Sequence, residues 1–416
     1  MKSAIRHSRA IAGLFLAVSP GFSPASPTQG SGLQITVGQT VEITRSHNRC
    51  WFPTVHRFRS GELLITMSMC PDEVNSEGIF SAYCISRDGG TTWSKRYTMG
   101  AEASDCWSEE PDADDAIWQF CTYPEWVREG DVLEYLADLT KFSHGGRHIS
   151  EDRDVLVTLA QPAHVTDNYL FDYKFGDPWP TSVPLADTRF KTQLDARSYG
   201  NIIKGAQGDL LCSAYILTAA DATRRAEDPT HRRFYRAILL RSTDGGKHWV
   251  EYATIAAVPP GRRPAWMGDE GCTEGSLSLL PDGRLYAVYR TSGKGGMIGN
   301  SWSADGGRTW TSPASIGFSG VAPRIHRLHN GMMVLATGRP GPVALRVNSD
   351  GLGKEWSGPS VLYSEMSTRY CDTVEVSPGK LLVVYDSVPY GWYEIPYADR
   401  AARNRIMGTF VEVANP

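Results

Sequence analysis

The stretch SRDGGTTW at residues 86–93 recurs as STDGGKHW at 242–249 and as SADGGRTW at 303–310. A fourth copy, NSDGLGKEW at 348–356, keeps the pattern with one inserted residue. Serine and aspartate side chains accept backbone N–H bonds in turns, glycine adopts a positive φ, and tryptophan covers the apolar side of a hairpin. Each copy therefore predicts a stapled β-turn between two strands, with a structural and not a catalytic role.

A second repeat consists of an apolar strand, a glycine-centred turn and another apolar strand, which is the pattern of a β-hairpin. Its turn glycines stand at positions 61, 130, 208, 283, 331 and 379. Each interval has room for several short strands, and no run shows convincing helical periodicity. The predicted fold class is all-β, a six-bladed β-propeller of four-stranded blades, with residues 26–416 as a single domain.

Residues 1–25 have the pattern of a secretory signal peptide, because Lys2, Arg6 and Arg9 precede the apolar run AIAGLFLAVS and small residues follow. Removing them takes away three bases and no acids, which changes the formal net charge from −4 to −7. Such a charge argues against nucleic acid as a partner. No later stretch has the roughly 18 to 20 apolar residues of a membrane span. We expect a secreted or periplasmic monomer.

The composition, with 41% hydrophobic and 21% charged residues, supports a large core and excludes disordered, collagen-like and coiled-coil chains. All eight cysteines follow residue 25. An even number in an oxidising compartment allows up to four disulfides, although the pairing cannot be deduced from spacing. Neither C-x-x-C nor H-E-x-x-H occurs, so we expect no metal site.

The distance from each turn glycine predicts which residues lie near the propeller axis. The innermost strand of a blade begins at the mouth of the central channel, where ligands bind. Seven or eight residues after their glycines, the second strands of the last three blades place Arg290, Arg339 and Asp386 at this mouth. Nine residues before the six glycines lie Phe52, Cys121, Tyr199, Glu274, Ala322 and Tyr370.

These motifs make the chain resemble the sialidase superfamily, the six-bladed Asp-box propellers, over essentially all of residues 26–416. The segment TEGSLSLLPDGRLYAVYR looks like the family's Glu-bearing and Arg-bearing strands. The resemblance implies that Glu274 activates the nucleophile and that Arg290 binds a substrate carboxylate. The segment RYCDTVEVSPGKLLVVYD looks like the one with the nucleophilic tyrosine, here Tyr370. By the same resemblance Arg339 is a second carboxylate-binding arginine, and Asp386 is the acid that supports the first arginine.

The first blade departs from the family pattern. Where the R-I-P signature is expected the chain has Trp51-Phe52-Pro53, so Trp51 replaces the first arginine. The acid/base aspartate is expected shortly before the first Asp-box, where CPDEVNSEGIF offers Asp72 and Glu77 as candidates. On the third blade, Tyr199 is a further candidate for substrate binding.

The residue types suit one reaction. A phenol is almost fully protonated at neutral pH, so it needs a neighbouring base such as Glu274 during attack. Two arginines can hold a carboxylate from two sides. The sequence thus favours an exo-acting glycoside hydrolase that removes a terminal, acidic, sialic-acid-like sugar with retention, without a cofactor. Two alternatives stay open: a related glycosidase or polysaccharide lyase using Glu77 and Glu274 as a carboxylate pair, and a glycan-binding propeller without turnover.

Overall fold

The computed structural model describes most of the chain after residue 31. The described ranges are 32–47, 50–69, 80–99, 105–129, 132–143, 147–158, 189–191, 197–217, 235–258, 262–291, 293, 296–391, 395, 399 and 401–414. The predicted signal peptide and two predicted site residues, Asp72 and Glu77, lie outside them.

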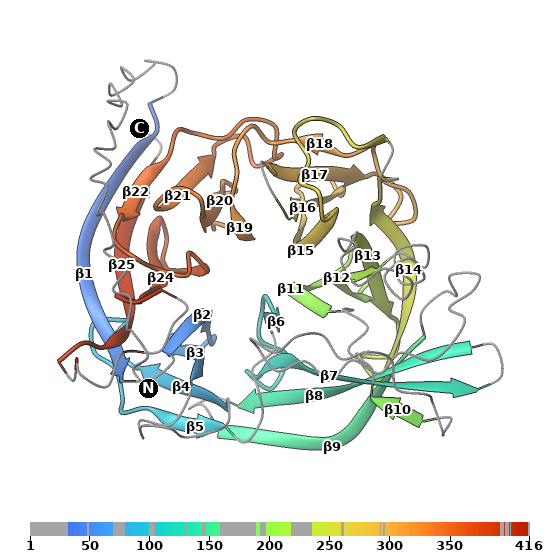
Figure 1. The fold of residues 1–416 in the computed structure, drawn as a ribbon, viewed down its shortest axis with the longest axis horizontal. Helices are drawn as coiled ribbons and strands as arrows, with labels where there is room; N and C mark the ends of the chain where they lie inside the picture. The colour runs from blue at the N-terminus through green and yellow to red at the C-terminus, as the bar shows by residue number, and fades with distance from the viewer. Residues whose placement is uncertain are drawn as a thin grey trace, which may run out of the picture.

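The described strands form an all-β structure of four-stranded antiparallel units, as the repeats predict, and the units lie around a common centre (Figure 1). Unit one contains β2 (Cys50–Arg57), β3 (Leu63–Met69), β4 (Phe80–Ser86) and β5 (Tyr97–Met99). Unit two contains β6 (Asp105–Ser108), β7 (Ile117–Glu129), β8 (Val132–Ser143) and β9 (Arg147–Thr158), beside a short strand β10 (Arg189–Lys191). Unit three contains β11 (Arg197–Lys204), β12 (Leu210–Leu217), β13 (Tyr235–Ser242) and β14 (His248–Ala256).

The remaining units follow the same plan. Unit four contains β15 (Cys272–Leu279), β16 (Leu285–Thr291), β17 (Ile298–Ser303) and β18 (Ala314–Ser315). Unit five contains β19 (Val321–Arg327), β20 (Met333–Gly338), β21 (Val343–Asn348) and β22 (Ser360–Tyr363). Unit six joins the two ends of the described chain, because β1 (Gln34–Ser46) pairs with β25 (Asn404–Ala414) beside β24 (Lys380–Ser387) and β23 (Cys371–Ser377).

Units two and three are fused into one nine-stranded sheet. Strand β6 pairs in parallel with β11, and β14 pairs in parallel with β9. The glycine at position 130 falls between β7 and β8, the second and third strands of unit two. The prediction that Cys121 lies in an innermost strand is therefore wrong: Cys121 lies in β7, and β6 takes the inner position.

The predicted box turns are present, and side chains close them. In the first box Ser86 Oγ donates to Asp88 Oδ1 at 2.8 Å, and Thr92 N donates to the same oxygen at 2.9 Å. The Trp93 indole N–H donates to Gly90 O at 3.0 Å. The degenerate fourth box is closed in a related way, by Gly353 N donating to Asn348 Oδ1 at 3.0 Å. Their role is structural, as predicted.

The core lies between neighbouring sheets. One apolar cluster joins units one and six through residues such as Ile65 and Leu382, and another joins units five and six through Val334 and Val383. This packing fixes the innermost strands, whose first residues build the candidate site. Within the described residues, no helix has the length and apolar character to cross a membrane.

Candidate active site

The innermost strands begin with an irregularity that aims side chains at the centre. In units one, four and five the strand register shifts near its start, and Phe52, Glu274 and Ala322 have positive φ values of 55°, 40° and 46°. In unit three Gly200 occupies the corresponding bulge, with φ 102°. Bulges redirect side chains, and positive φ in non-glycine residues stores backbone strain. In units one, four and five, the residue nine positions before the turn glycine is thus the one that lies at the bulge.

The Tyr370 phenol and the Glu274 carboxylate meet across units six and four. Tyr370 Oη donates to Glu274 Oε1 at 2.6 Å, and Arg290 Nη1 donates to the same carboxylate oxygen at 2.8 Å. Arg290 Nη1 lies 3.4 Å from Tyr370 Oη. The other carboxylate oxygen accepts a bond of 2.9 Å from Ala322 N in unit five. Glu274 is thereby fixed from three directions and is 7% exposed.

The phenol keeps its proton in this environment. Burial, and next the negative charge of Glu274, raise the pKa of Tyr370 well above its usual value, although Arg290 acts in the opposite direction. A protonated phenol is a weak nucleophile unless a base takes its proton during attack. The hydrogen bond to Glu274 Oε1 places that base within reach, which is the first requirement for general base catalysis.

Aromatic side chains surround the phenol. The Phe52 ring packs edge-on against the Tyr370 ring, with 4.7 Å between centroids. On the unit-three side Tyr370 packs against a buried cluster that contains Tyr199, Tyr215 and Tyr235. The predicted site residue Tyr199 thus forms part of the wall beside Tyr370. Tyr215 lies on β12, seven residues after Gly208, so the spacing that places Arg290 near the axis applies to it as well. Tyr235 begins β13, outside this hairpin, and has no such spacing signal.

Arg339 approaches Tyr370 from unit five. Its guanidinium carbon lies 5.5 Å from the centroid of the Tyr370 ring, within cation–π range. Arg339 Nη2 donates to the carbonyl oxygen of Thr368 at 2.7 Å. Two guanidinium groups, those of Arg290 and Arg339, therefore flank the phenol, as the spacing after the turn glycines predicts.

Asp386 holds the segment that leads to Tyr370. Its fully buried carboxylate accepts bonds from Ser367 Oγ at 2.8 Å, from Thr368 N at 2.7 Å and from the Thr368 hydroxyl. It also accepts Phe52 N at 3.2 Å, which links unit six to unit one. Burial raises the pKa of Asp386 above its usual value, and these bonds favour the charged form. Through these contacts Asp386 orients backbone groups near Phe52 and Thr368. The position at which the family pattern predicts an arginine partner for Asp386 is occupied by Trp51, which is 6% exposed and lies beside Phe52.

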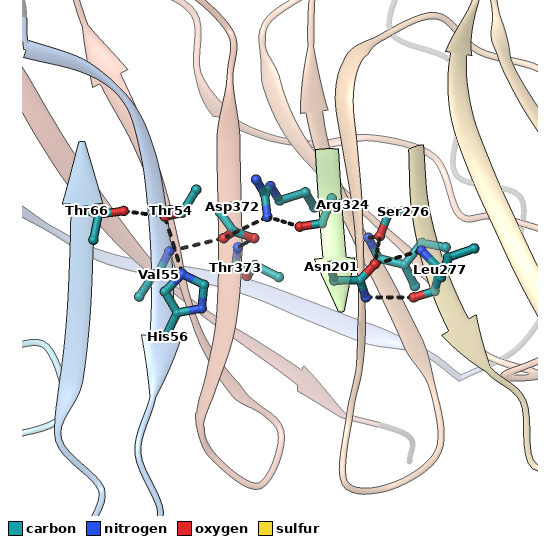
Figure 2. Close-up of polar contacts among 12 residues, drawn as sticks. Thr54, Val55, His56, Thr66, Asn201, Ser276, Leu277, Arg324, Asp372 and Thr373 are labelled. Carbon is teal, nitrogen blue, oxygen red and sulfur yellow. Dashed lines mark hydrogen bonds and ion pairs between the residues drawn. The ribbon is translucent and has the colours of Figure 1, made fainter. Parts of the chain in front are cut away.

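One layer deeper, a polar network joins the inner strands (Figure 2). The Arg324 guanidinium of unit five lies 3.9 Å from Asp372 of unit six and donates to Gly200 O of unit three at 2.9 Å. Asp372 also accepts Val55 N of unit one at 3.1 Å. Asn201 of unit three donates to Leu277 O of unit four at 2.7 Å. Inner strands expose unpaired backbone groups at their edges, and these side chains satisfy them.

A cavity of about 300 Å³ is lined by residues of this network, among them Arg324 and Asp372, and by Glu109. Burial, and next the Glu110 carboxylate, raise the pKa of Glu109 to about 8, although Arg327 and Asn201 favour its charged form. Asp372 adds a smaller upward contribution. The folded protein thus favours the protonated form of this carboxyl group.

Glu109 predicts a pH dependence of stability. Between its ordinary pKa of 4.5 and its folded value of about 8, the folded protein binds one proton more than the unfolded chain. The free energy of unfolding therefore falls as pH rises through this window. Glu109→Gln, which mimics the protonated acid, is expected to lack this loss. Denaturant unfolding at about pH 5 and about pH 9 measures the free energy of unfolding of both proteins. If the free energies of the unsubstituted protein and of Glu109→Gln differed by the same amount at both pH values, the assignment would be refuted.

Within the described residues, no group of three or more histidine, cysteine, aspartate or glutamate side chains is placed to hold a metal ion. The candidate site thus consists of a phenol, a carboxylate, two guanidinium groups and an aromatic wall. Such a set can bind a sugar and perform nucleophilic and base chemistry. Asp72 and Glu77, the predicted proton donors, lie outside the described residues.

Comparisons with known proteins agree with this fold. Residues 191–383 match the model of the BNR repeat-like domain. A protein of unknown function from Dyadobacter fermentans has a similar structure, with a TM-score of 0.62 and 19% identity, over 92% of this chain and 100% of that one. A search of curated protein sequences found no significant match.

Two enzymes of known activity also have similar structures. The Hadza microbial sialidase Hz136 matches with a TM-score of 0.52 and 15% identity, over 88% of this chain and 65% of that one. The α-L-arabinofuranosidase Arb93A from Fusarium graminearum matches with a TM-score of 0.54 and 14% identity, over 90% and 98% of the two chains. Residues 191–383 therefore resemble a BNR repeat-like domain, and the fold of the chain is similar to the folds of a sialidase and of an α-L-arabinofuranosidase.

Proposed function

We propose that the protein is a glycoside hydrolase that removes a terminal sugar through a covalent intermediate on Tyr370. The observation that carries the proposal is the 2.6 Å hydrogen bond from Tyr370 Oη to Glu274 Oε1, with Arg290 bonded to the same oxygen. Burial raises the pKa of the Tyr370 phenol, and ionisable groups with perturbed pKa values concentrate at functional sites, which supports a catalytic role for Tyr370.

In the first step Tyr370 Oη attacks the anomeric carbon while Glu274 takes the phenol proton. The bond to the leaving glycosidic oxygen breaks, and a protonated acid, for which we propose Asp72 or Glu77, gives that oxygen a proton. In the second step the now deprotonated acid takes a proton from water, the water oxygen displaces the tyrosine oxygen at the anomeric carbon, and Tyr370 Oη recovers its proton from Glu274. Two inversions at one carbon give net retention.

The substrate class follows from the charge around the phenol. We infer a terminal acidic sugar, because Arg290 and Arg339 place two cations beside Tyr370 and guanidinium forks hold carboxylates well. The sialidase of similar fold acts on such a sugar. A neutral sugar is the second candidate. Buried Trp51 replaces one predicted arginine, and an α-L-arabinofuranosidase shares the fold over nearly its whole length.

An assay with aryl α-sialosides and aryl α-L-arabinofuranosides separates these candidates. We expect release of the aryl group from the sialoside, and a sugar product that has kept its anomeric configuration when NMR spectra are recorded before mutarotation. Turnover of the arabinofuranoside alone would establish the neutral candidate. Inversion in either case would exclude the tyrosine intermediate, and sugar binding without turnover of any substrate would favour the non-catalytic propeller.

A further inference from the structure

Two cysteines meet where units two and three fuse. Cys106 lies on β6 and Cys212 on β12, and their Sγ atoms are 3.0 Å apart. Both side chains are fully buried. The eight cysteines of the chain leave pairing open at the level of sequence, and this contact selects one pair.

The local sheet geometry brings these sulfur atoms together from both sides of β11. In the parallel pairing of β6 with β11, Cys106 lies opposite Gly200. On the other edge of β11, Cys212 lies opposite Ile202. The register of β11 shifts between Ser198 and Ile202, where Gly200 has a positive φ. The cysteines thus flank the bulged part of β11, at the junction where β6 of unit two pairs with β11 of unit three.

We propose that Cys106 and Cys212 form a disulfide that joins unit two to unit three. The present sulfur separation exceeds a disulfide bond of about 2.0 Å by roughly 1 Å, which small side-chain and backbone movements can close. The bond forms as the two thiols lose two protons and two electrons. A disulfide oxidant such as oxidised glutathione accepts them and is reduced to two thiols.

The bond must form while the chain folds. Burial, and next the contact with Cys106, raise the pKa of Cys212 well above its usual value, which leaves little thiolate for exchange once the strands have packed. The two cysteines are 106 positions apart, so the bond closes a long loop that includes β7 to β10. Closing such a loop restricts the unfolded chain. It also fixes β11, whose Tyr199 forms part of the wall beside Tyr370.

The test is a peptide map without reductant. The reduced, unfolded protein is refolded in a glutathione redox buffer, its remaining thiols are blocked with N-ethylmaleimide under denaturing conditions, and it is digested with a protease. We expect the peptide that links Cys106 to Cys212 to account for most of both residues. Recovery of both cysteines as alkylated thiols, or of either one linked mainly to another cysteine, would overturn the proposal.

Two cysteine variants serve as controls for the peptide map. Cys272→Ala, which removes another buried thiol, is expected to keep the Cys106–Cys212 peptide. In Cys106→Ala, Cys212 is expected to appear almost entirely as the alkylated thiol. If Cys212 stays protected in a disulfide in that variant, the pairing is wrong. The same map on protein exported to an oxidising compartment and purified without reductant serves if refolding fails.

Discussion

Replacement of Tyr370 by phenylalanine is expected to lower turnover on the order of 10⁴-fold or more while the protein stays folded, because a double displacement cannot proceed without its nucleophile. The variant removes one oxygen atom and leaves the ring in its contact with Phe52. Glu274 keeps its bonds to Arg290 at 2.8 Å and to Ala322 N at 2.9 Å, so no carboxylate is left without a partner. Steady-state kinetics on the best aryl glycoside, with circular dichroism for the fold, measure the effect.

A matched control is available in Tyr385→Phe. Tyr385 is a buried tyrosine of β24 whose hydroxyl contacts Thr409 Oγ1 at 2.8 Å, away from the phenol–carboxylate pair. The same loss of a hydroxyl there should cost about 1 kcal/mol of stability and leave turnover intact. If Tyr370→Phe and Tyr385→Phe lowered turnover alike, the loss would reflect general destabilisation, and Tyr370 would lose its assigned role.

Arg324→Met is expected to destabilise the folded protein by about 3–5 kcal/mol, the cost of leaving a buried carboxylate without its cation. Arg324 lies 3.9 Å from Asp372 and also bonds Gly200 O at 2.9 Å, so its loss affects three units of the fold (Figure 2). Burial already raises the pKa of Asp372, and Arg324 lowers it. Denaturant unfolding at neutral pH measures the change.

A second substitution tests whether the lost ion pair is the cause. In Arg324→Met combined with Asp372→Asn, neither charge of the pair remains, and we expect part of the stability to return. The penalty of Arg324→Met alone should also shrink at acidic pH, because protonation of Asp372 removes the unpaired charge. Simple additivity of the two substitutions, with a penalty that does not change with pH, would show that Arg324 contributes through packing and its bond to Gly200 O, and not through the ion pair.

The sequence predicts the fold well because its turns are closed locally. The Ser86–Asp88–Gly90 turn is held by side chains within a few residues, so a short motif suffices to identify it. Counting from the turn glycines also works where the hairpin contains the innermost strand, as for Glu274 in β15. It fails for Cys121, because the hairpin around position 130 joins β7 to β8. The parallel pairings of β6 with β11 and of β9 with β14 depend on contacts distant in sequence and have no local pattern.

The candidate site is predictable in part for a related reason. The positions of Glu274, Arg290 and Tyr370 follow from a strand register that repeats from unit to unit. The positive φ of Glu274 has no local signal, since glycine is the residue that usually marks such a conformation. The spacing after Gly379 predicts that Asp386 lies near the axis, but its hydrogen bonds to Thr368 and Phe52 join separate segments of the chain, so its partners emerge only from the folded structure.

The claim on which the functional account depends is that Tyr370 bonds covalently to the sugar. It is tested most directly by incubating the protein with activated fluorinated analogues of the sialoside and of the arabinofuranoside, which slow breakdown of a glycosyl–enzyme intermediate, followed by peptide mass spectrometry. The account predicts one added sugar on the peptide that carries Tyr370, and no adduct in Tyr370→Phe. An adduct on a carboxylate such as Glu274 or Glu77 would contradict it and would establish the carboxylate-pair mechanism in its place.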